Sequence, residues 1–309
     1  MSITIIKPGI SSSLQHFGHW GEQEFGVSIG GVMDDFSASI ANIICSNKAT
    51  TPVIEMTLHG TEILFNKAAC ISITGSGSIA TINDTEVPYY KLLQIPAYAI
   101  LKMKPSAKGC RSYLAIAGGY KDRACGRPFT TGDVIDVEER PNSFNGIHHA
   151  ENKIVISHWK IHLDEDELLE KSIDCIEGPE FDWFETKAQS AFFSNRFTLS
   201  NQSNRMGYRL NEKIAGPKEK KELISTAVTR GIVQITHDGT PIVLMADAQT
   251  TGGYPRIARI APADIAKLAQ CRPGDTICFK KITEESSLLK TSQRLNALKK
   301  IRSSIQMIQ

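Results

Sequence analysis

The sequence contains no long hydrophobic run and no marked excess of charge of either sign. No stretch approaches the roughly 18 consecutive apolar residues of a membrane-spanning helix, and the segment from Ser2 to Pro8 is too short and polar for a secretory signal. Lysine and arginine number 35 against 33 aspartates and glutamates, a surplus too small for a protein that must neutralise many phosphates. We therefore expect a cytoplasmic protein that binds neither a membrane nor a nucleic acid.

Paired cysteines and the familiar catalytic motifs are also missing. Seven cysteines occur at irregular spacing without a C-x-x-C pair, which argues against a disulfide framework and against a structural zinc site. The sequence has no phosphate-binding P-loop, no dinucleotide-binding glycine motif, no H-E-x-x-H and no G-x-S-x-G. We expect reduced, mostly buried thiols and no metal site, and the absences disfavour hydride transfer and zinc proteolysis.

Short runs of β-branched and aliphatic residues, separated by short polar gaps, dominate what is present. Such spacing is typical of antiparallel sheets, sandwiches or barrels rather than of alternating strands and helices, so we expect a mainly β fold with a few helices. The expected strands are 3–6, 53–58, 62–65, 69–74, 79–82, 98–103 and 112–117, then 154–157, 172–176, 197–199, 231–235, 241–245, 257–260 and 275–279.

Helices are expected at four places. One covers 35–45, opening with Asp35 as a capping residue, and two shorter helices cover 182–189 and 261–270. After Phe279 the chain becomes basic, and apolar residues recur at helical spacing, which predicts an amphipathic helix that packs on its own domain or on a partner. The apolar residues of this tail are Leu288, Leu295, Leu298, Ile301, Ile305 and Ile308.

A polar stretch over 138–152 divides the chain and is the expected linker. It contains adjacent His148 and His149, which we interpret as part of a solvated loop because neighbouring side chains rarely converge on one ion. We accordingly expect an N-terminal β domain over 1–145, a C-terminal β domain over 146–280 and the basic helical tail over 281–309.

Two segments combine residue types that suit a binding site. In the first, a predicted buried strand runs into a turn with two glycines, Gly252 and Gly253, whose N–H groups are candidates to face an anion or oxyanion. A plain tight hairpin is the alternative. The polar residues clustered around this turn are Asp247, Gln249, Thr251 and Tyr254.

The second segment is Ser203-Asn204-Arg205-Met206-Gly207-Tyr208-Arg209-Leu210. Arg205 and Arg209 lie at i, i+4 spacing or on one side of a bent loop, and guanidinium groups bind carboxylate or phosphate in a bidentate manner. The pair therefore suits a small anionic substrate, with two ordinary surface charges as the alternative.

Ordered motifs along almost the whole chain up to Phe279 resemble one known family, the biotin-dependent carboxyltransferase family. That family includes the C subunit of 5-oxoprolinase, formerly allophanate hydrolase subunit 2, together with KipA and the carboxyltransferase part of urea carboxylase. The motifs are Ile6-Lys7-Pro8-Gly9-Ile10, Gln15-x-x-Gly18, Gly31-Val32-Met33-Asp34, Ala41-Asn42, Ile54-Glu55-Met56-Thr57, the run from Arg111 to Gly119, the run from Ser203 to Leu210 and Asp247-x-Gln249-Thr250-Thr251-Gly252-Gly253-Tyr254-Pro255.

The resemblance implies two cyclophilin-like β-barrel domains and a heteromeric, ATP-dependent hydrolase. In that complex a KipI-like protein, the B-type subunit, and a LamB/YcsF-like protein, the A-type subunit, join the C-type chain, and 5-oxoproline is opened to glutamate with ATP, expected as Mg-ATP. Phosphorylation of the lactam oxygen would supply a leaving group before water attacks. By this resemblance Asp34 and Asp247 are the candidate catalytic residues, and the substrate-binding candidates are Gln15, Arg205, Arg209, Gln249, Thr251, Gly252, Gly253 and Tyr254.

Two departures from the family pattern bear on activity. The usual Gln-Asp-x-Gly-Arg is Gln-His-Phe-Gly-His over 15–19, and only six residues separate Gly119 from Gly126, where relatives carry a longer loop with Ser-Arg-Ser-Thr. The shortened loop leaves the catalytic competence of this chain open. Two alternatives to the hydrolase follow: a non-catalytic, KipA-like regulatory partner, and a carboxyltransferase subunit that acts on a urea-like substrate with biotin carried on another chain.

Overall fold

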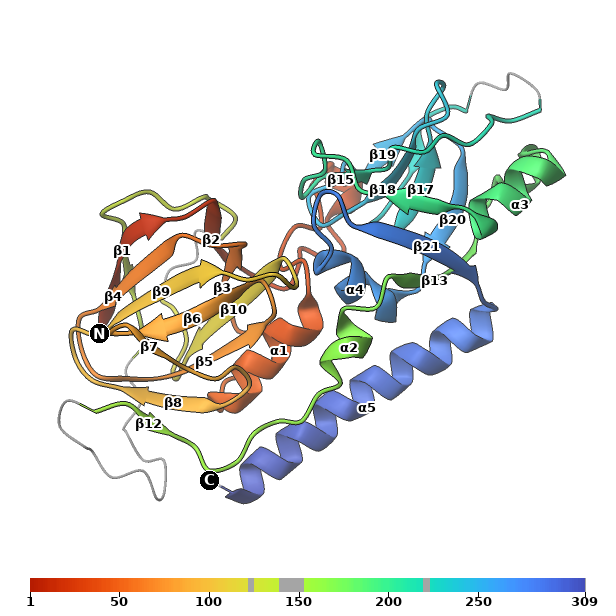
Figure 1. The fold of residues 1–309 in the computed structure, drawn as a ribbon. Coiled ribbons are helices and arrows are strands. Elements are labelled where there is room, and N and C mark those ends of the chain that lie inside the picture. Colours follow the sequence, from red (N-terminus) through yellow and green to blue (C-terminus); the bar gives the residue numbers. More distant parts are fainter. Residues whose placement is uncertain (122–124, 139–152, 219–222, 309) are drawn as a thin grey trace. The chain divides into compact units, whose positions relative to one another are not determined.

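The computed structural model describes residues 1–121, 125–138, 153–218 and 223–308, which divide into two compact units. Unit 1 comprises residues 1–17, 34–165 and 296–309, and unit 2 comprises residues 18–33 and 166–295. Each unit is built mainly from β-strands, as Figure 1 shows.

Unit 1 contains two six-stranded sheets whose described pairings are all antiparallel. The strand orders are β11-β1-β4-β9-β6-β7 and β12-β8-β5-β10-β3-β2. The strands are β1 (Ser2–Pro8), β2 (Ser11–Gln15), β3 (Val53–Thr57), β4 (Thr61–Phe65), β5 (Ala69–Gly75), β6 (Ser78–Ile82), β7 (Thr85–Glu86), β8 (Leu92–Ile95), β9 (Ile100–Pro105), β10 (Arg111–Ile116), β11 (Val134–Asp136) and β12 (Val155–Ile156).

Apolar residues from both sheets of unit 1 form one buried cluster, which includes Ile5, Phe65, Ile73 and Leu114. Because side chains alternate along a strand, the second sheet turns its other face away from this core. Helix α1 (Asp35–Ile44) packs on that other face, against β5 and β10. A row of polar residues lies on the same face, and this row supplies the polar site residues of unit 1.

Unit 2 contains a seven-stranded sheet in the order β14-β21-β13-β20-β17-β18-β15 and the separate pair β16-β19. In the large sheet β13 and β21 are parallel, and the other described pairings are antiparallel. The strands are β13 (Ser172–Glu177), β14 (Arg196–Thr198), β15 (Gly207–Arg209), β16 (Thr226–Ala227), β17 (Ile232–Ile235), β18 (Pro241–Leu244), β19 (Thr251–Gly252), β20 (Arg256–Ile260) and β21 (Thr276–Lys281).

Short helices complete unit 2. They are η1 (Gln23–Phe25), η2 (Phe181–Trp183), α3 (Thr186–Ser194), η3 (Pro262–Asp264) and α4 (Ile265–Ala269). The core is rich in phenylalanine, and the rings of Phe192 and Phe279 stack with centroids 4.6 Å apart. Helix α2 (Glu165–Leu168) begins at the last residue of the middle segment of unit 1.

The division into units differs from the predicted boundaries in two places. Residues 18–33 belong to unit 2, since the Gly30 N–H donates to the Ala246 carbonyl at 2.8 Å. The predicted strand 154–157 belongs to unit 1, since β12 pairs with β8. The expected linker over 138–152, with His148 and His149, lies outside the described residues except for Glu138.

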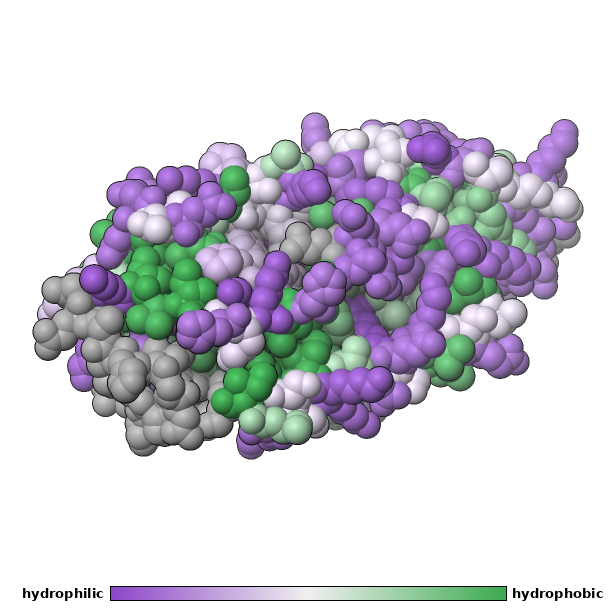
Figure 2. Space-filling view, turned by 60° about the horizontal axis from the view of Figure 1, so that its bottom comes forward, coloured by the Kyte–Doolittle hydropathy of each residue, from purple (hydrophilic) through white to green (hydrophobic). Residues whose placement is uncertain are grey.

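The basic tail is helical, as predicted, but its inward face differs from the predicted apolar stripe. Helix α5 (Glu284–Ile308) belongs to unit 2 up to Leu295 and to unit 1 from Asn296. In its first half Lys290 pairs with Asp174 and Arg294 donates to the Ala263 carbonyl. Leu288, Leu295 and Ile308, expected to be covered, are exposed, whereas Ile305 is buried. Figure 2 shows one face of the chain, on which hydrophilic and hydrophobic side chains are mixed.

Several strands escaped the sequence analysis because few of their residues are apolar. They include β2, a serine-rich strand with Leu14 as its one large apolar residue, and β15, whose sequence is Gly-Tyr-Arg. The predicted helix 182–189 is displaced, because η2 and α3 share this region and α3 continues to Ser194.

A buried ion pair between Glu180 and Arg256 links the η2 region to β20. Arg256 Nε and Nη2 lie 2.8 and 2.6 Å from the two carboxylate oxygens. Burial alone would raise the pKa of Glu180, but hydrogen bonds from Arg256 outweigh burial and lower it. The stabilisation is therefore present above the ordinary pKa of 4.5 and is lost as pH falls through the lowered value in the folded protein.

We predict that Glu180→Gln lowers the free energy of unfolding by about 1–3 kcal/mol near neutral pH, because it weakens a nearly buried charged pair. It should also flatten the acid side of the stability profile. Urea unfolding between about pH 3 and pH 7 measures both effects. Glu177→Gln is the matched control, since Glu177 pairs with Lys281 at a more exposed position. Equal pH profiles for wild type and Glu180→Gln would contradict the prediction.

Candidate functional site

The two segments singled out in the sequence lie side by side in unit 2. Strand β15 pairs antiparallel with β18, with Tyr208 opposite Val243. The pairing continues past both strands, because the Met245 N–H donates to Met206 O at 3.1 Å and the Asp247 N–H donates to Arg205 O at 2.9 Å. The ladder therefore places Arg205 directly beside Asp247.

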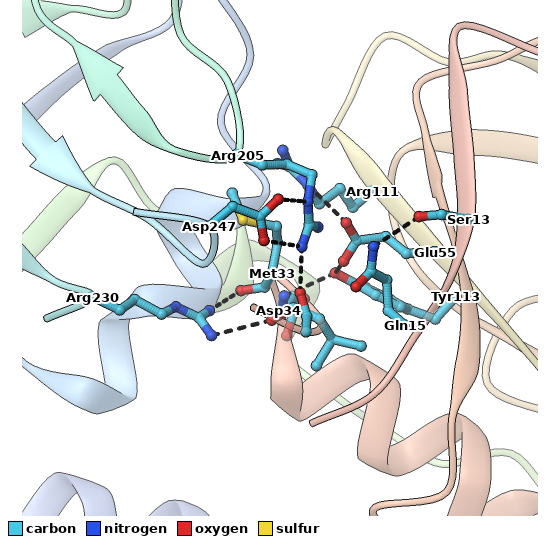
Figure 3. Close-up of polar contacts among 12 residues, drawn as sticks. Ser13, Gln15, Met33, Asp34, Glu55, Arg111, Tyr113, Arg205, Arg230 and Asp247 are labelled. Atoms are coloured by element: carbon cyan, nitrogen blue, oxygen red, sulfur yellow. Dashed lines mark hydrogen bonds and ion pairs between the residues drawn. The ribbon is translucent and has the colours of Figure 1, made fainter. Parts of the chain in front are cut away.

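Arg205 donates two parallel hydrogen bonds to the Asp247 carboxylate (Figure 3). Its Nε lies 2.7 Å from Oδ2 and its Nη2 lies 2.9 Å from Oδ1, while Nη2 also donates to the Gly31 carbonyl at 2.6 Å. Bidentate pairing holds the guanidinium plane in one orientation. Asp247 thus occupies the position that a substrate carboxylate or phosphate would take on this guanidinium, and its own side chain is 40% exposed.

A second arginine, Arg230, holds the same N-terminal segment and was not found from the sequence. Its Nη1 donates to the Val32 carbonyl at 3.1 Å and its Nη2 donates to the Met33 carbonyl. Figure 3 shows both arginines reaching toward this stretch of backbone. Three consecutive carbonyls, from Gly31 to Met33, therefore accept hydrogen bonds from guanidinium groups within unit 2.

A small pocket in unit 2 lies next to this arrangement. Its polar lining residues come from the turn after β18, from the approach to β17 and from the N-terminal segment, and Arg230 is the one ionisable residue among the lining residues. The pocket therefore combines a single positive charge with amide and hydroxyl groups and an apolar wall. The lining residues are Gln23, Ile29, Val228, Thr229, Arg230, Met245, Ala246, Ala248, Gln249 and Thr250.

The double-glycine turn has an ordinary strand geometry. Gly252 lies in β19 opposite Thr226, and neither Gly252 nor Gly253 has a left-handed φ. A Cβ at Gly252 would lie 2.7 Å from Gln234 Nε2, so a larger residue there would displace the Gln234 amide. The pair does not form the left-handed turn in which successive N–H groups converge on an anion.

The remaining predicted residues of unit 2 are spread around this turn. Gln249 lines the pocket, whereas Thr251 is exposed in β19. Arg209 is exposed in β15, and its guanidinium takes part in no ion pair or hydrogen bond within the described part of the chain. Because β15 is a strand, Arg209 does not share a helical face with Arg205. The Tyr254 ring packs edge-on against His237, with centroids 5.2 Å apart.

In unit 1 the carboxylate of Asp34 caps helix α1. Its Oδ1 accepts from the Ser37 N–H at 2.9 Å and its Oδ2 accepts from the Ser37 hydroxyl at 2.6 Å. The residue is fully buried, and the cap is Asp34 rather than the predicted Asp35. A carboxylate engaged in this way performs the structural task of an N-cap.

A buried hydrogen-bonded chain of three residues joins Asp34 to the sheet of unit 1. The Tyr113 hydroxyl accepts from the Asp34 N–H at 2.8 Å and donates to Glu55 Oε2 at 2.9 Å. Arg111 Nε lies 3.7 Å from Glu55 Oε1. Burial, followed by the nearby carboxylates of Glu55 and Asp34, raises the pKa of Tyr113 well above its ordinary value, so the phenol stays protonated and keeps donating.

Gln15 also lies on the polar face of this sheet, at the end of β2. It is 2% exposed, its Nε2 donates to Ser13 Oγ at 2.8 Å, and its Oε1 is buried without a hydrogen-bond partner among the described residues. An unpaired buried carbonyl oxygen costs free energy. The Gln15 carbonyl oxygen is thus, among the described residues, an unpaired acceptor within the buried polar row of unit 1.

The strand register explains the buried polar row and shows which signal in the sequence was missed. Ser13 and Tyr113 both lie opposite Glu55 on its two neighbouring strands. Glu55 stands inside the apolar strand Val-Ile-Glu-Met-Thr, and a charged residue at an inward position of a strand calls for a partner. That anomaly was visible in the sequence, but the identity of its partner depends on the register.

Three further observations concern the thiols, the possible metal ligands and the helices of the described residues. The cysteines form no disulfide there, five of the seven are buried, and burial raises the pKa of Cys70 to about 11. No group of three or more His, Cys, Asp or Glu residues in the described ranges is placed to hold a metal ion. No helix of the described chain is long and apolar enough to cross a membrane.

Comparison with known proteins identifies the class to which this fold and these residues belong. The family model for the carboxyltransferase domain, subdomains A and B, matches residues 25–125 and 122–281. The C subunit of Escherichia coli 5-oxoprolinase is 34% identical over 303 residues that cover 93% of both chains. Saccharomyces cerevisiae urea amidolyase is 30% identical over 94% of this chain and 17% of the yeast protein.

The solved structure of Kluyveromyces lactis urea amidolyase has the same fold, with a TM-score of 0.83 over 97% of this chain at 23% sequence identity. This chain spans about a fifth of that larger protein, at 20% of its length. The chain therefore belongs to the carboxyltransferase domain A and B family. Both the predicted family and the mainly β fold are confirmed.

We predict that Asp34→Ala destabilises the protein by about 1–2 kcal/mol, because the first turn of α1 loses its capping acceptor. Asp34→Asn, which keeps an acceptor oxygen, should cost less. Urea unfolding of the two variants measures the difference. If Asp34→Ala unfolds at the same denaturant concentration as the wild type, the carboxylate has no structural task and its candidacy as a catalytic group is strengthened.

Proposed function

We propose that this chain is the C-type component of an ATP-dependent 5-oxoprolinase, which cleaves 5-oxoproline to glutamate together with A-type (LamB/YcsF-like) and B-type (KipI-like) partners. The observation that carries the proposal is the pocket of unit 2, with its single positively charged lining residue, in a chain that matches the C subunit of E. coli 5-oxoprolinase over 93% of both lengths. That reciprocal coverage favours the 5-oxoprolinase component over the urea amidolyases, of which the chain matches 17% in the yeast protein.

The polar groups around the pocket suit a small lactam with one carboxylate that binds at the pocket mouth, because the enclosed cavity of about 10 Å³ admits one water-sized group. Arg230 offers the positive charge that a carboxylate pairs with, and Gln249 and Thr250 offer amide and hydroxyl groups to a ring amide. Ile29, Val228 and Met245 supply an apolar wall for the methylene groups of the ring. Burying a small anion on such a wall requires the charge that Arg230 provides.

Asp247 is the carboxylate that we assign to proton transfer in this function. It is partly exposed, and its pairing with Arg205 holds the carboxylate in one orientation. A positioned carboxylate can accept a proton from an attacking water, provided that the water lies within hydrogen-bond reach. Asp34 is less suited to this task, because both of its oxygens already accept from Ser37.

ATP enters the proposal through the partner proteins. The sequence has no P-loop, and the described residues contain no carboxylate cluster for the Mg²⁺ of Mg-ATP. We assign nucleotide binding to the assembled complex, and this chain supplies substrate contacts. An ATP-consuming reaction of this kind places the complex in the cytoplasm. In this assignment no biotin is carried on this chain.

We predict that the full chain, mixed with its A-type and B-type partners, supports 5-oxoproline-dependent ADP formation. Arg230→Met should lower kcat/KM at least about tenfold, because it removes a charge-assisted contact to the substrate carboxylate. Thr250→Val, which is nearly isosteric, should raise KM by a smaller factor. Coupled measurement of ADP release tests each variant, and circular dichroism verifies that each variant folds.

The E. coli relative, placed in the same mixture, is the control for active partners. ADP release with the E. coli protein but not with this chain contradicts the proposal, and it favours the non-catalytic partner role to which the shortened loop points. Avidin-sensitive carboxylation of urea by this chain with a biotinylated carrier protein would replace the proposal by the carboxyl-transfer alternative, which the family's name and the urea amidolyase fold favour.

A further inference from the structure

Residues 19–29 form a closed loop in unit 2 whose two ends are tied together. The His19 N–H donates to the Ile29 carbonyl at 2.7 Å, and the next residue, Gly30, donates to Ala246 O at 2.8 Å. Beyond this neck, the Gly31 carbonyl accepts from Arg205. A loop with adjacent, hydrogen-bonded ends and its own internal contacts is a compact Ω-loop.

The tip of the loop is ordered by its own hydrogen bonds. The Phe25 N–H donates to Glu22 O at 3.1 Å, and the Gly26 N–H donates to Gln23 O at 3.0 Å, which closes the short helix η1. The side chain of Gln23 accepts from the Gly21 N–H at 2.9 Å. Gly26 has φ of +79°, a left-handed conformation that glycine adopts without strain. The loop therefore loses little conformational entropy when it binds.

This ordered loop presents two large aromatic residues to solvent. Phe25 is 77% exposed and Trp20 is 67% exposed, although both side chains carry much apolar area. A Cβ at Gly18 would lie 2.8 Å from Trp20 Nε1, so the indole ring packs close to the backbone of Gly18 at the base of the loop. Exposed aromatic residues on a rigid support are characteristic of the anchors of protein interfaces.

The negative charge of the loop indicates which kind of partner surface it can bind. Between residues 18 and 33 the sequence has Glu22 and Glu24 and no lysine or arginine. Both glutamates are exposed and flank the aromatic residues. Symmetric self-association through this loop would bring glutamates together, and an anionic membrane would repel them. A protein surface with an apolar depression and a rim of lysine or arginine complements the loop.

We propose that the loop 19–29 is the docking element for a partner protein of the complex that presents such a basic, apolar surface. The proposal rests on the proposed function for the existence of that partner. Docking at this loop would also affect the pocket, because Gln23 and Ile29 belong to this loop segment and line the pocket. A partner seated on Trp20 and Phe25 fixes that wall of the pocket, so assembly and substrate affinity are coupled.

The test is calorimetric titration of the full-length chain with each of the A-type and B-type partners, at about 0.05 M and 0.3 M salt. We expect Phe25→Asn to weaken binding of one partner at least about tenfold, as for an aromatic anchor. Glu22→Lys with Glu24→Lys should weaken it at low salt and much less at high salt. Tyr98→Asn is the matched control, because Tyr98 is 74% exposed in unit 1, and its affinity should match the wild type.

Each outcome bears on one of the two proposals. Wild-type affinity for Phe25→Asn, or no binding of either partner by the wild-type chain, overturns the docking loop. So does self-association in sedimentation, or binding to anionic vesicles, that Phe25→Asn abolishes. Assembly that depends on Phe25 in a mixture without 5-oxoproline-dependent ADP release supports the docking loop while the proposed function fails.

Discussion

The hydrogen bonds from Arg205 and Arg230 to the carbonyls of residues 31–33 are the interactions on which the candidate site of unit 2 depends. Buried peptide carbonyls outside a β-sheet need hydrogen-bond donors, and charged donors make stronger hydrogen bonds than neutral ones. Here the two arginines hold the N-terminal segment 18–33 in a unit whose other residues are 166–295. The same segment supplies Gln23 and Ile29 to the pocket, so its attachment decides the pocket's shape.

The arrangement also explains the pairing of Arg205 with Asp247. Burying part of a guanidinium without an anion would cost free energy, and the Asp247 carboxylate offsets this cost. Asp247 thereby fixes the orientation of the Arg205 guanidinium, which also donates to the Gly31 carbonyl. In unit 1 the same logic applies to Glu55, which is buried and receives the Tyr113 hydroxyl and the Arg111 charge. Both units thus carry acidic side chains whose partners come from neighbouring segments of the chain.

Much of the β architecture was predictable, because strands such as β5 (Ala69–Gly75) and β10 (Arg111–Ile116) are rich in aliphatic residues and are flanked by polar or glycine residues. Strands β2 and β15 were not, since serine, glycine and arginine give no periodic apolar signal. The sequence analysis singled out the segments that contain Arg205 and Asp247 but did not predict contact between these two side chains. Their direct contact follows from the pairing of β15 with β18, which depends on register. Arg230 and Tyr113 were missed as site residues for the same reason.

The discontinuous course of unit 2 has a consequence for the order in which the protein is made. Gly31 and Arg205 are 174 positions apart, and the parallel partner of β13 is the late strand β21. On a ribosome, the segment 18–33 emerges long before the residues that hold it, and it must wait unanchored while residues 34–165 are synthesised. Unit 2 can close only after β21 has left the exit tunnel, so an interruption of translation before that strand leaves Trp20 and Phe25 on a segment without its anchors.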